Sequence, residues 1–178
     1  SEWGPLIDDA LSRSADWAPE LKTRLLKARA EWVGEDGGSL EAQLDAWRVY
    51  LDDHPADLNA LEKLYELAVS LDAWSELGEE VAAAYERAFS LRKVGKQQVL
   101  EVLADLYGER LDRPDDAARV WRIILELSPT RDDAGEWLTL YHAQRRDWYQ
   151  LLLTCALWDP RDQTSRWIES KVRAHLGL

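Results

Sequence analysis

The chain has 178 residues, with 34 acidic and 22 basic side chains and a formal net charge of −12. A surface this acidic repels phosphate, which argues against nucleic acid or an anionic membrane as a partner and favours a basic or neutral protein surface. No run of about 18 apolar residues occurs, so the sequence predicts no membrane insertion.

Two residue counts carry further predictions. The single cysteine, Cys155, excludes an internal disulfide and a cysteine-based zinc site, which favours a reducing compartment such as the cytoplasm. Met is absent even at the first position, so we expect a segment of a longer protein. A targeting segment could then precede it, so the compartment stays open.

Apolar residues recur with helical spacing along the chain, and Gly, Pro and Asp clusters interrupt them at regular intervals. The pattern predicts an all-α chain of about ten helices, near 3–13, 17–33, 39–53, 57–71, 74–91, 96–111, 115–127, 131–145, 147–158 and 162–176. Because the links between them are short, helices adjacent in sequence are expected to pack antiparallel.

An internal repeat connects the two halves of the chain. The stretch AWRVYLDDHP at 46–55 corresponds to VWRIILELSP at 120–129, which pairs Trp47 with Trp121 and Arg48 with Arg122. Self-similarity at a fixed period is typical of stacked helical repeats.

The stretch VLADLYGERLDRPDDAARVWRIILELSP resembles a tetratricopeptide-repeat (TPR) unit. Ala104 and Tyr107 match the small and aromatic positions of its first helix, Ala117 and Trp121 those of its second, and Pro129 its end. The loop before Ala117 is one residue longer than the family pattern.

This resemblance implies an α-solenoid of stacked antiparallel helix pairs, forming a right-handed superhelix. We expect one array over residues 1–178, with pairs near 17–53, 57–91, 96–127 and 131–158 and half-units at both ends. A lone helical hairpin cannot bury its apolar stripe, whereas stacked hairpins share a continuous core.

Most of the ten Trp residues follow the repeat. Those expected to fill wedges between helices are Trp3, Trp32, Trp47, Trp74, Trp121, Trp137 and Trp148. Trp17, Trp158 and Trp167 lie outside the repeat positions, and for them contact with a partner and ordinary packing both remain open.

The sequence predicts no catalytic set, metal site or cofactor. The His residues are scattered without metal-ligand spacing, and the Gly-rich stretch at 34–39 lacks the Lys-Ser/Thr of a phosphate loop. Cys155, in the middle of an apolar helix, is expected to be a small buried filler.

Resemblance to TPR arrays also implies a concave groove lined by the first helix of each pair. The residues expected to face it are Asn59, Lys63, Glu66, Gln98, Glu101, Asp105, Asp132, Thr139 and His142. TPR domains that grip a C-terminal carboxylate use Lys, Asn and Arg here, so Glu101 and Asp105 oppose that ligand and favour a basic or neutral segment. The alternative is that these are solvated charges without a partner.

Two functions follow as hypotheses. The first is a non-catalytic scaffold that binds a protein or peptide partner on its concave face. The second is a helical spacer or assembly domain of a larger, possibly enzymatic, protein, which contacts neighbouring domains of its own chain or associates with itself through the end half-units.

Overall fold

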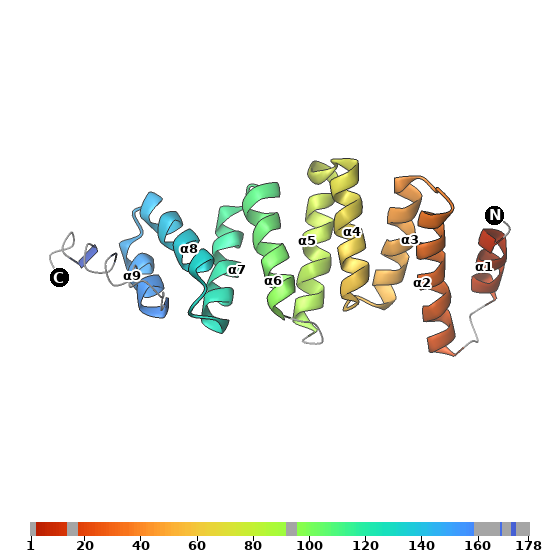
Figure 1. Cartoon of the computed structure of the whole chain (residues 1–178), viewed down its shortest axis with the longest axis horizontal. Helices are drawn as coiled ribbons and strands as arrows, with labels where there is room; N and C mark the ends of the chain where they lie inside the picture. The colour runs from red at the N-terminus through yellow and green to blue at the C-terminus, as the bar shows by residue number, and fades with distance from the viewer. Residues whose placement is uncertain (1–2, 14–17, 92–95, 159–167, 169–171, 174–178) are drawn as a thin grey trace. The chain divides into compact units, whose positions relative to one another are not determined.

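The computed structural model describes residues 3–13, 18–91, 96–158, 168 and 172–173. These residues form helices joined by short turns, and no strand occurs among them (Figure 1). The predicted all-α fold is confirmed. Within the described ranges, no helix is long and apolar enough to cross a membrane.

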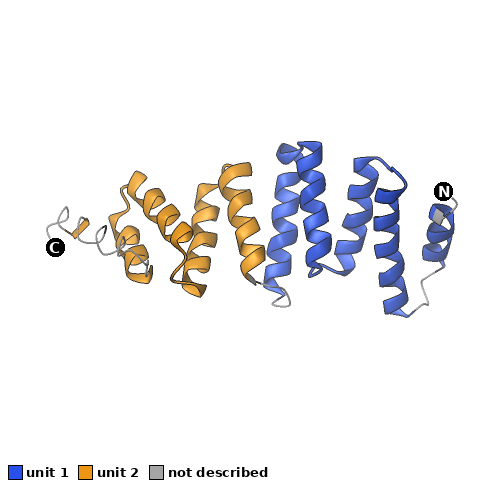
Figure 2. Ribbon diagram, viewed as in Figure 1, with its two compact units in different colours: residues 1–94 blue, residues 95–178 orange. Residues whose placement is uncertain are grey.

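The chain divides into two compact units, residues 1–94 and 95–178 (Figure 2). Each is described here by itself. That the units together form one array remains a prediction.

Unit 1 consists of helices that each pack on the next along the chain. They are α1 (Trp3–Ser12), α2 (Pro19–Glu35), α3 (Leu40–Asp53), α4 (Leu58–Leu71) and α5 (Trp74–Ser90). Their ends lie within two residues of the predicted ones, because the breakers that set the prediction also act as caps.

Two polar side chains show how these helices begin. Ser39 precedes α3 and its hydroxyl accepts a hydrogen bond from the backbone N–H of Ala42 at 3.2 Å. Asp57 precedes α4 and accepts from the N–H groups of Asn59 and Ala60 at 3.1 and 3.3 Å. Each cap satisfies N–H groups that the first helical turn leaves without a partner.

The core of unit 1 lies where α3, α4 and α5 meet. Its largest fully buried side chains are Leu61 and Leu64 of α4 and Val81 and Tyr85 of α5. Trp47 of α3, a predicted wedge residue, is 6% exposed. Apolar burial between successive helices therefore holds the stack together, as expected of a repeat array.

Unit 2 repeats this arrangement. It comprises α6 (Lys96–Asp105), which continues into the π-helical turn η2 (Leu106–Arg110), followed by α7 (Pro114–Leu127), α8 (Asp132–Gln144) and α9 (Trp148–Leu157). The helix predicted near 162–176 falls mostly outside the described residues, although Val172 packs against Leu151 and the buried Cys155. The burial of Cys155 confirms its predicted place in the core.

The π-helical turn modifies the predicted helix 96–111. The N–H of Leu111 donates to the carbonyl of Leu106 at 2.9 Å, five residues back, so the last turn is wider than an α-helical one. Pro114 then opens α7, with Asp115 and Asp116 in the first turn, where carboxylates complement the helix dipole.

Two glycines allow a Trp ring to lie directly against a neighbouring helix. A Cβ atom added to Gly135 of α8 would overlap the indole of Trp158, and one added to Gly4 of α1 would overlap the ring of Trp32 in α2. Both contacts are small-against-aromatic packing of the kind that the repeat pattern predicts.

Candidate partner-binding site

The acidic hollow is a depression of about 210 Å³ between the first helices of successive pairs in unit 2, α6 and α8. Its lining residues are Glu101, Ala104, Asp105, Gly108, Glu109, Trp121 and Trp137. Three of these carry carboxylates and two carry indole rings. The combination attracts a cation through both charge and aromatic faces.

The carboxylates reach one surface because of their spacing. Glu101, Asp105 and Glu109 follow one another at intervals of four residues, and residues four apart lie on the same face of a helix. Glu109 is exposed, whereas Glu101 and Asp105 are partly exposed. All three therefore stand where solvent or a partner reaches them.

A basic residue stands at the rim of the acidic hollow. Arg131, just before α8, donates from Nη1 to Glu101, and its Nε and Nη2 donate to the Asp133 carboxylate at 2.8 and 2.5 Å. The Arg131 hydrogen bonds are the main reason that the pKa of Asp133 lies below its ordinary value. Arg131 thus links the start of α8 to α6 and neutralises part of the charge of Glu101.

The indoles of the hollow belong to a ladder of aromatic rings. Trp121 and Trp137 have centroids 6.2 Å apart, and Trp137 stacks on Tyr141 at 5.2 Å with 16° between the planes. The Arg145 guanidinium lies 4.7 Å from the centroid of Tyr141 and pairs with Asp115 at 2.6 Å. Burial, together with a hydrogen bond to Asp115, raises the pKa of Tyr141 to about 12, so this hydroxyl stays a proton donor at neutral pH.

The structure divides the predicted unit 2 residues into two groups. Glu101 and Asp105 line the acidic hollow, and Gln98 is exposed one turn before Glu101. Thr139 and His142, in contrast, are 7% and 6% exposed, which differs from the surface position expected of them. The Thr139 hydroxyl donates to the carbonyl of Glu136 at 2.9 Å, while Nε2 of His142 has no hydrogen-bond partner.

Burial has an electrical consequence for His142. It lowers the pKa of the imidazole, with a smaller opposing effect from Asp147 and contributions from Arg122 and Arg145 that lower it further. At neutral pH the side chain is therefore an uncharged member of the unit 2 core. The register argument failed here because α8 turns these two positions inward, towards its neighbours.

In unit 1, the predicted residues Asn59, Lys63 and Glu66 are exposed on α4. Lys63 Nζ lies 2.6 Å from Glu66 Oε2, so the two charges offset one another on the surface. This part of the prediction is a polar helix face without net charge. Its role stays a proposal.

The three Trp residues outside the repeat register have different outcomes. Trp158 is 3% exposed, packs against Gly135 and points its Nε1 at Asp132 at 3.4 Å, which is ordinary packing. Trp17 and Trp167 lie outside the described residues. Of the positions where contact with a partner was left open, Trp158 is therefore internal.

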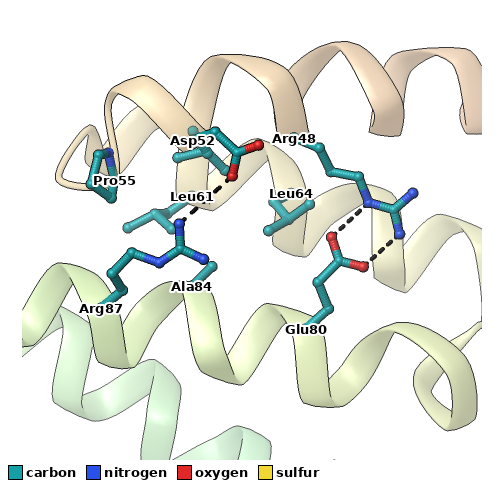
Figure 3. A pocket seen from close by; sticks show the side chains of 9 residues that line it. Arg48, Asp52, Pro55, Leu61, Leu64, Glu80, Ala84 and Arg87 are labelled. Atoms are coloured by element: carbon teal, nitrogen blue, oxygen red, sulfur yellow. Dashed lines mark hydrogen bonds and ion pairs between the residues drawn. The ribbon is translucent and has the colours of Figure 1, made fainter.

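A second depression lies between the second helices of unit 1, α3 and α5 (Figure 3). This leucine hollow, of about 190 Å³, is lined by Arg48, Leu51, Asp52, Pro55, Leu61, Leu64, Glu80, Ala84 and Arg87. Two ion pairs connect its walls: Arg48 Nη2 with Glu80 Oε2 at 2.5 Å, and Arg87 Nη1 with Asp52 Oδ1 at 3.7 Å. Its charges are balanced, so it favours neither sign of partner.

Unit 2 carries a smaller counterpart of the leucine hollow, of about 110 Å³. Arg122, Leu125, Glu126, Leu138 and Thr154 line it, each 74 residues after Arg48, Leu51, Asp52, Leu64 and Glu80. The repeat seen in the sequence is thus also a repeat of surface shape.

Sequence reasoning missed part of the acidic hollow. Trp121 and Trp137 were expected to fill wedges, and both do contact neighbours, yet each stays partly exposed and lines the depression. Glu109 was not considered, although its four-residue spacing from Asp105 was a usable signal. Gly108 leaves room because it has no side chain.

Known proteins resemble the chain in fold. No protein-family model matches the sequence, and no curated protein matches it. The crystal structure of a tetratricopeptide repeat protein from Parabacteroides merdae ATCC 43184 matches with a TM-score of 0.52 and 18% sequence identity. The alignment covers 98% of this chain, which spans 66% of the length of the other. The fold is therefore that of a TPR-like array of helix pairs, a class that in general serves protein interaction.

Proposed function

We propose that the chain is a non-catalytic interaction scaffold that binds a basic segment of a partner protein, with the acidic hollow of unit 2 as the anchoring site. The observation that carries this proposal is the meeting of Glu101, Asp105 and Glu109 with the faces of Trp121 and Trp137. Function does not follow from fold, so the proposal rests on this site.

Charge supports the choice of partner. The chain has a net charge of −12, and the hollow adds a local concentration of carboxylates. Opposite charge on a partner speeds encounter and suppresses binding of acidic competitors. The exposed polar face of α4 in unit 1, with Asn59, Lys63 and Glu66, would contact a neutral part of the same segment.

The test is an affinity capture from a lysate of the source organism, with mass-spectrometric identification. The wild-type chain is compared with the double variant Asp105→Lys/Glu109→Lys, which leaves the Arg131–Glu101 pair in place. A matched control, Glu20→Lys/Glu35→Lys, makes the same change of charge on the exposed face of α2. Circular dichroism first establishes that all three proteins are equally helical.

We expect proteins with basic segments that the wild type and the control retain and that the Asp105/Glu109 variant loses. Retention of the same proteins by all three would contradict the proposal. Recovery of the chain itself, or of the rest of its parent protein, would contradict it too and would favour the spacer or assembly function.

A further inference from the structure

We infer that the acidic hollow selects an arginine side chain over a lysine side chain of the bound segment. This inference rests on the proposed function, since it names the group that would enter the same site. It is argued from how unit 2 already treats its own guanidinium groups.

Unit 2 places a guanidinium between an aromatic ring and a carboxylate twice. Arg145 lies 4.7 Å from the Tyr141 centroid and pairs with Asp115 at 2.6 Å. Arg113 lies 4.9 Å from the Tyr107 centroid and pairs with Asp116 at 2.6 Å. In both cases the planar cation stacks on a ring while its N–H groups reach an acid, an arrangement suited to arginine.

The acidic hollow presents the same two elements at the other end of the aromatic ladder. Arg145 covers Tyr141 at one end of the ladder, and at the other end Trp121 faces the hollow together with Asp105 and Glu109. An indole is a better partner for a cation than a phenol ring. A guanidinium from outside the chain would therefore find a ring and acids in the combination that Arg145 finds inside it.

Lysine fits this combination less well. Lys27 in unit 1 also lies near a ring and an acid, Tyr50 and Asp57, but its Nζ is 5.8 Å from the centroid, farther than either guanidinium. An ammonium is a compact, strongly hydrated charge, whereas a guanidinium is weakly hydrated and stacks flat. Stacking should therefore add to the affinity for arginine without adding as much for lysine.

The size of the hollow limits what enters it. Its volume of about 210 Å³ lies below the range typical of pockets for whole small-molecule ligands, roughly 300–1,000 Å³. It suits one long side chain projecting from an extended segment. The rest of the segment would lie over the exposed surfaces of α6 and α8.

The test is isothermal titration of the full chain with three synthetic peptides of one Gly/Ser-rich sequence. They carry two arginines, two lysines, or two citrullines, which keep the shape of arginine without its charge. We expect the arginine peptide to bind about tenfold more tightly than the lysine peptide, the size of one modest cation–π contact, and the citrulline peptide not to saturate.

Two variants connect this selectivity to the site. Asp105→Asn/Glu109→Gln should weaken both charged peptides, while Trp121→Leu, if circular dichroism shows it folded, should remove the preference for arginine. Glu126→Gln, outside the hollow, is the control and should bind like the wild type.

The outcomes separate the two proposals. Equal binding of the arginine and lysine peptides, or undiminished binding of citrulline, would overturn arginine selectivity and leave the proposed function standing. If no peptide binds and the Asp105→Lys/Glu109→Lys variant captures the same partners as the wild type, both are overturned.

Discussion

Arg48 of α3 grips Glu80 of α5 with two hydrogen bonds, Nε to Oε1 at 2.6 Å and Nη2 to Oε2 at 2.5 Å. Arg122 stands 74 residues later and reaches from α7 to α9 in the same way, but its acceptor is the neutral Gln150. The second helices of successive pairs are thus tied by an arginine in each unit, and only the charge of the acceptor differs.

We expect the Arg48–Glu80 pair to contribute little to stability. The two side chains are 36% and 39% exposed, so water screens them, and such pairs are worth about 0.2–1 kcal/mol. A double-mutant cycle of Arg48→Met and Glu80→Gln, followed by urea unfolding, measures the coupling. It should shrink with added salt, and a salt-independent coupling above about 2 kcal/mol would contradict this account.

Gly135→Ala should destabilise unit 2 by about 1–3 kcal/mol, because the new methyl group overlaps the indole of Trp158. Alanine's higher helix propensity, worth about 1 kcal/mol, offsets part of that loss. The control is Gly108→Ala, where the nearest atom to an added Cβ is Ala117 Cβ at 3.7 Å. The control should be neutral or stabilising in thermal unfolding, and equal effects of the two variants would show that the Trp158 contact is unimportant.

His142 should make unit 2 less stable in mild acid. Its pKa is lowered from 6.5 by burial, so below pH 6.5 the unfolded chain takes up a proton that the folded chain does not. This contribution to stability is therefore present above pH 6.5 and is lost as the pH falls towards the folded pKa.

The measurement is the free energy of unfolding of the wild type and of His142→Phe between pH 7.5 and 5. Carboxylates affect both proteins alike, so the difference between the two curves isolates the imidazole. The stability of the variant should change less over this interval. Parallel curves would mean that His142 keeps its ordinary pKa.

Asp57 joins three parts of unit 1 and should be sensitive to substitution. It caps α4 and also accepts hydrogen bonds from the Tyr50 hydroxyl at 2.7 Å and from Lys27 Nζ at 3.1 Å. Asp57→Ala should cost about 1–3 kcal/mol, while Asp57→Asn, which can still cap the helix, should cost less. Chemical unfolding of the two variants tests this order, and a more harmful Asn would contradict it.

The repeat made much of the fold predictable. Helix ends were placed within two residues in unit 1 because Ser39 and Pro55 break the chain in ways visible in the sequence. The π-helical turn at Leu106–Arg110 was not predictable, since its hydrogen-bond pattern depends on how the chain enters α7. The division into two units also leaves no local signal that a single sequence displays.

The candidate site was predictable only in part. Glu101 and Asp105 were chosen from the register of the first helices, and they do line the acidic hollow. Thr139 and His142 came from the same rule, yet they are buried. Register specifies where a residue stands along a repeat, but a small rotation of α8 decides which side chains face its neighbours.

The central claim is that the acidic hollow holds the cationic side chain of a partner segment. It is tested most directly by following the indole N–H signals of all ten Trp residues by nuclear magnetic resonance while the arginine peptide is added. We predict that the signals of Trp121 and Trp137 move first and saturate together, while that of Trp47, buried in unit 1, stays in place. Movement spread evenly over the Trp residues, or confined to unit 1, would contradict the claim.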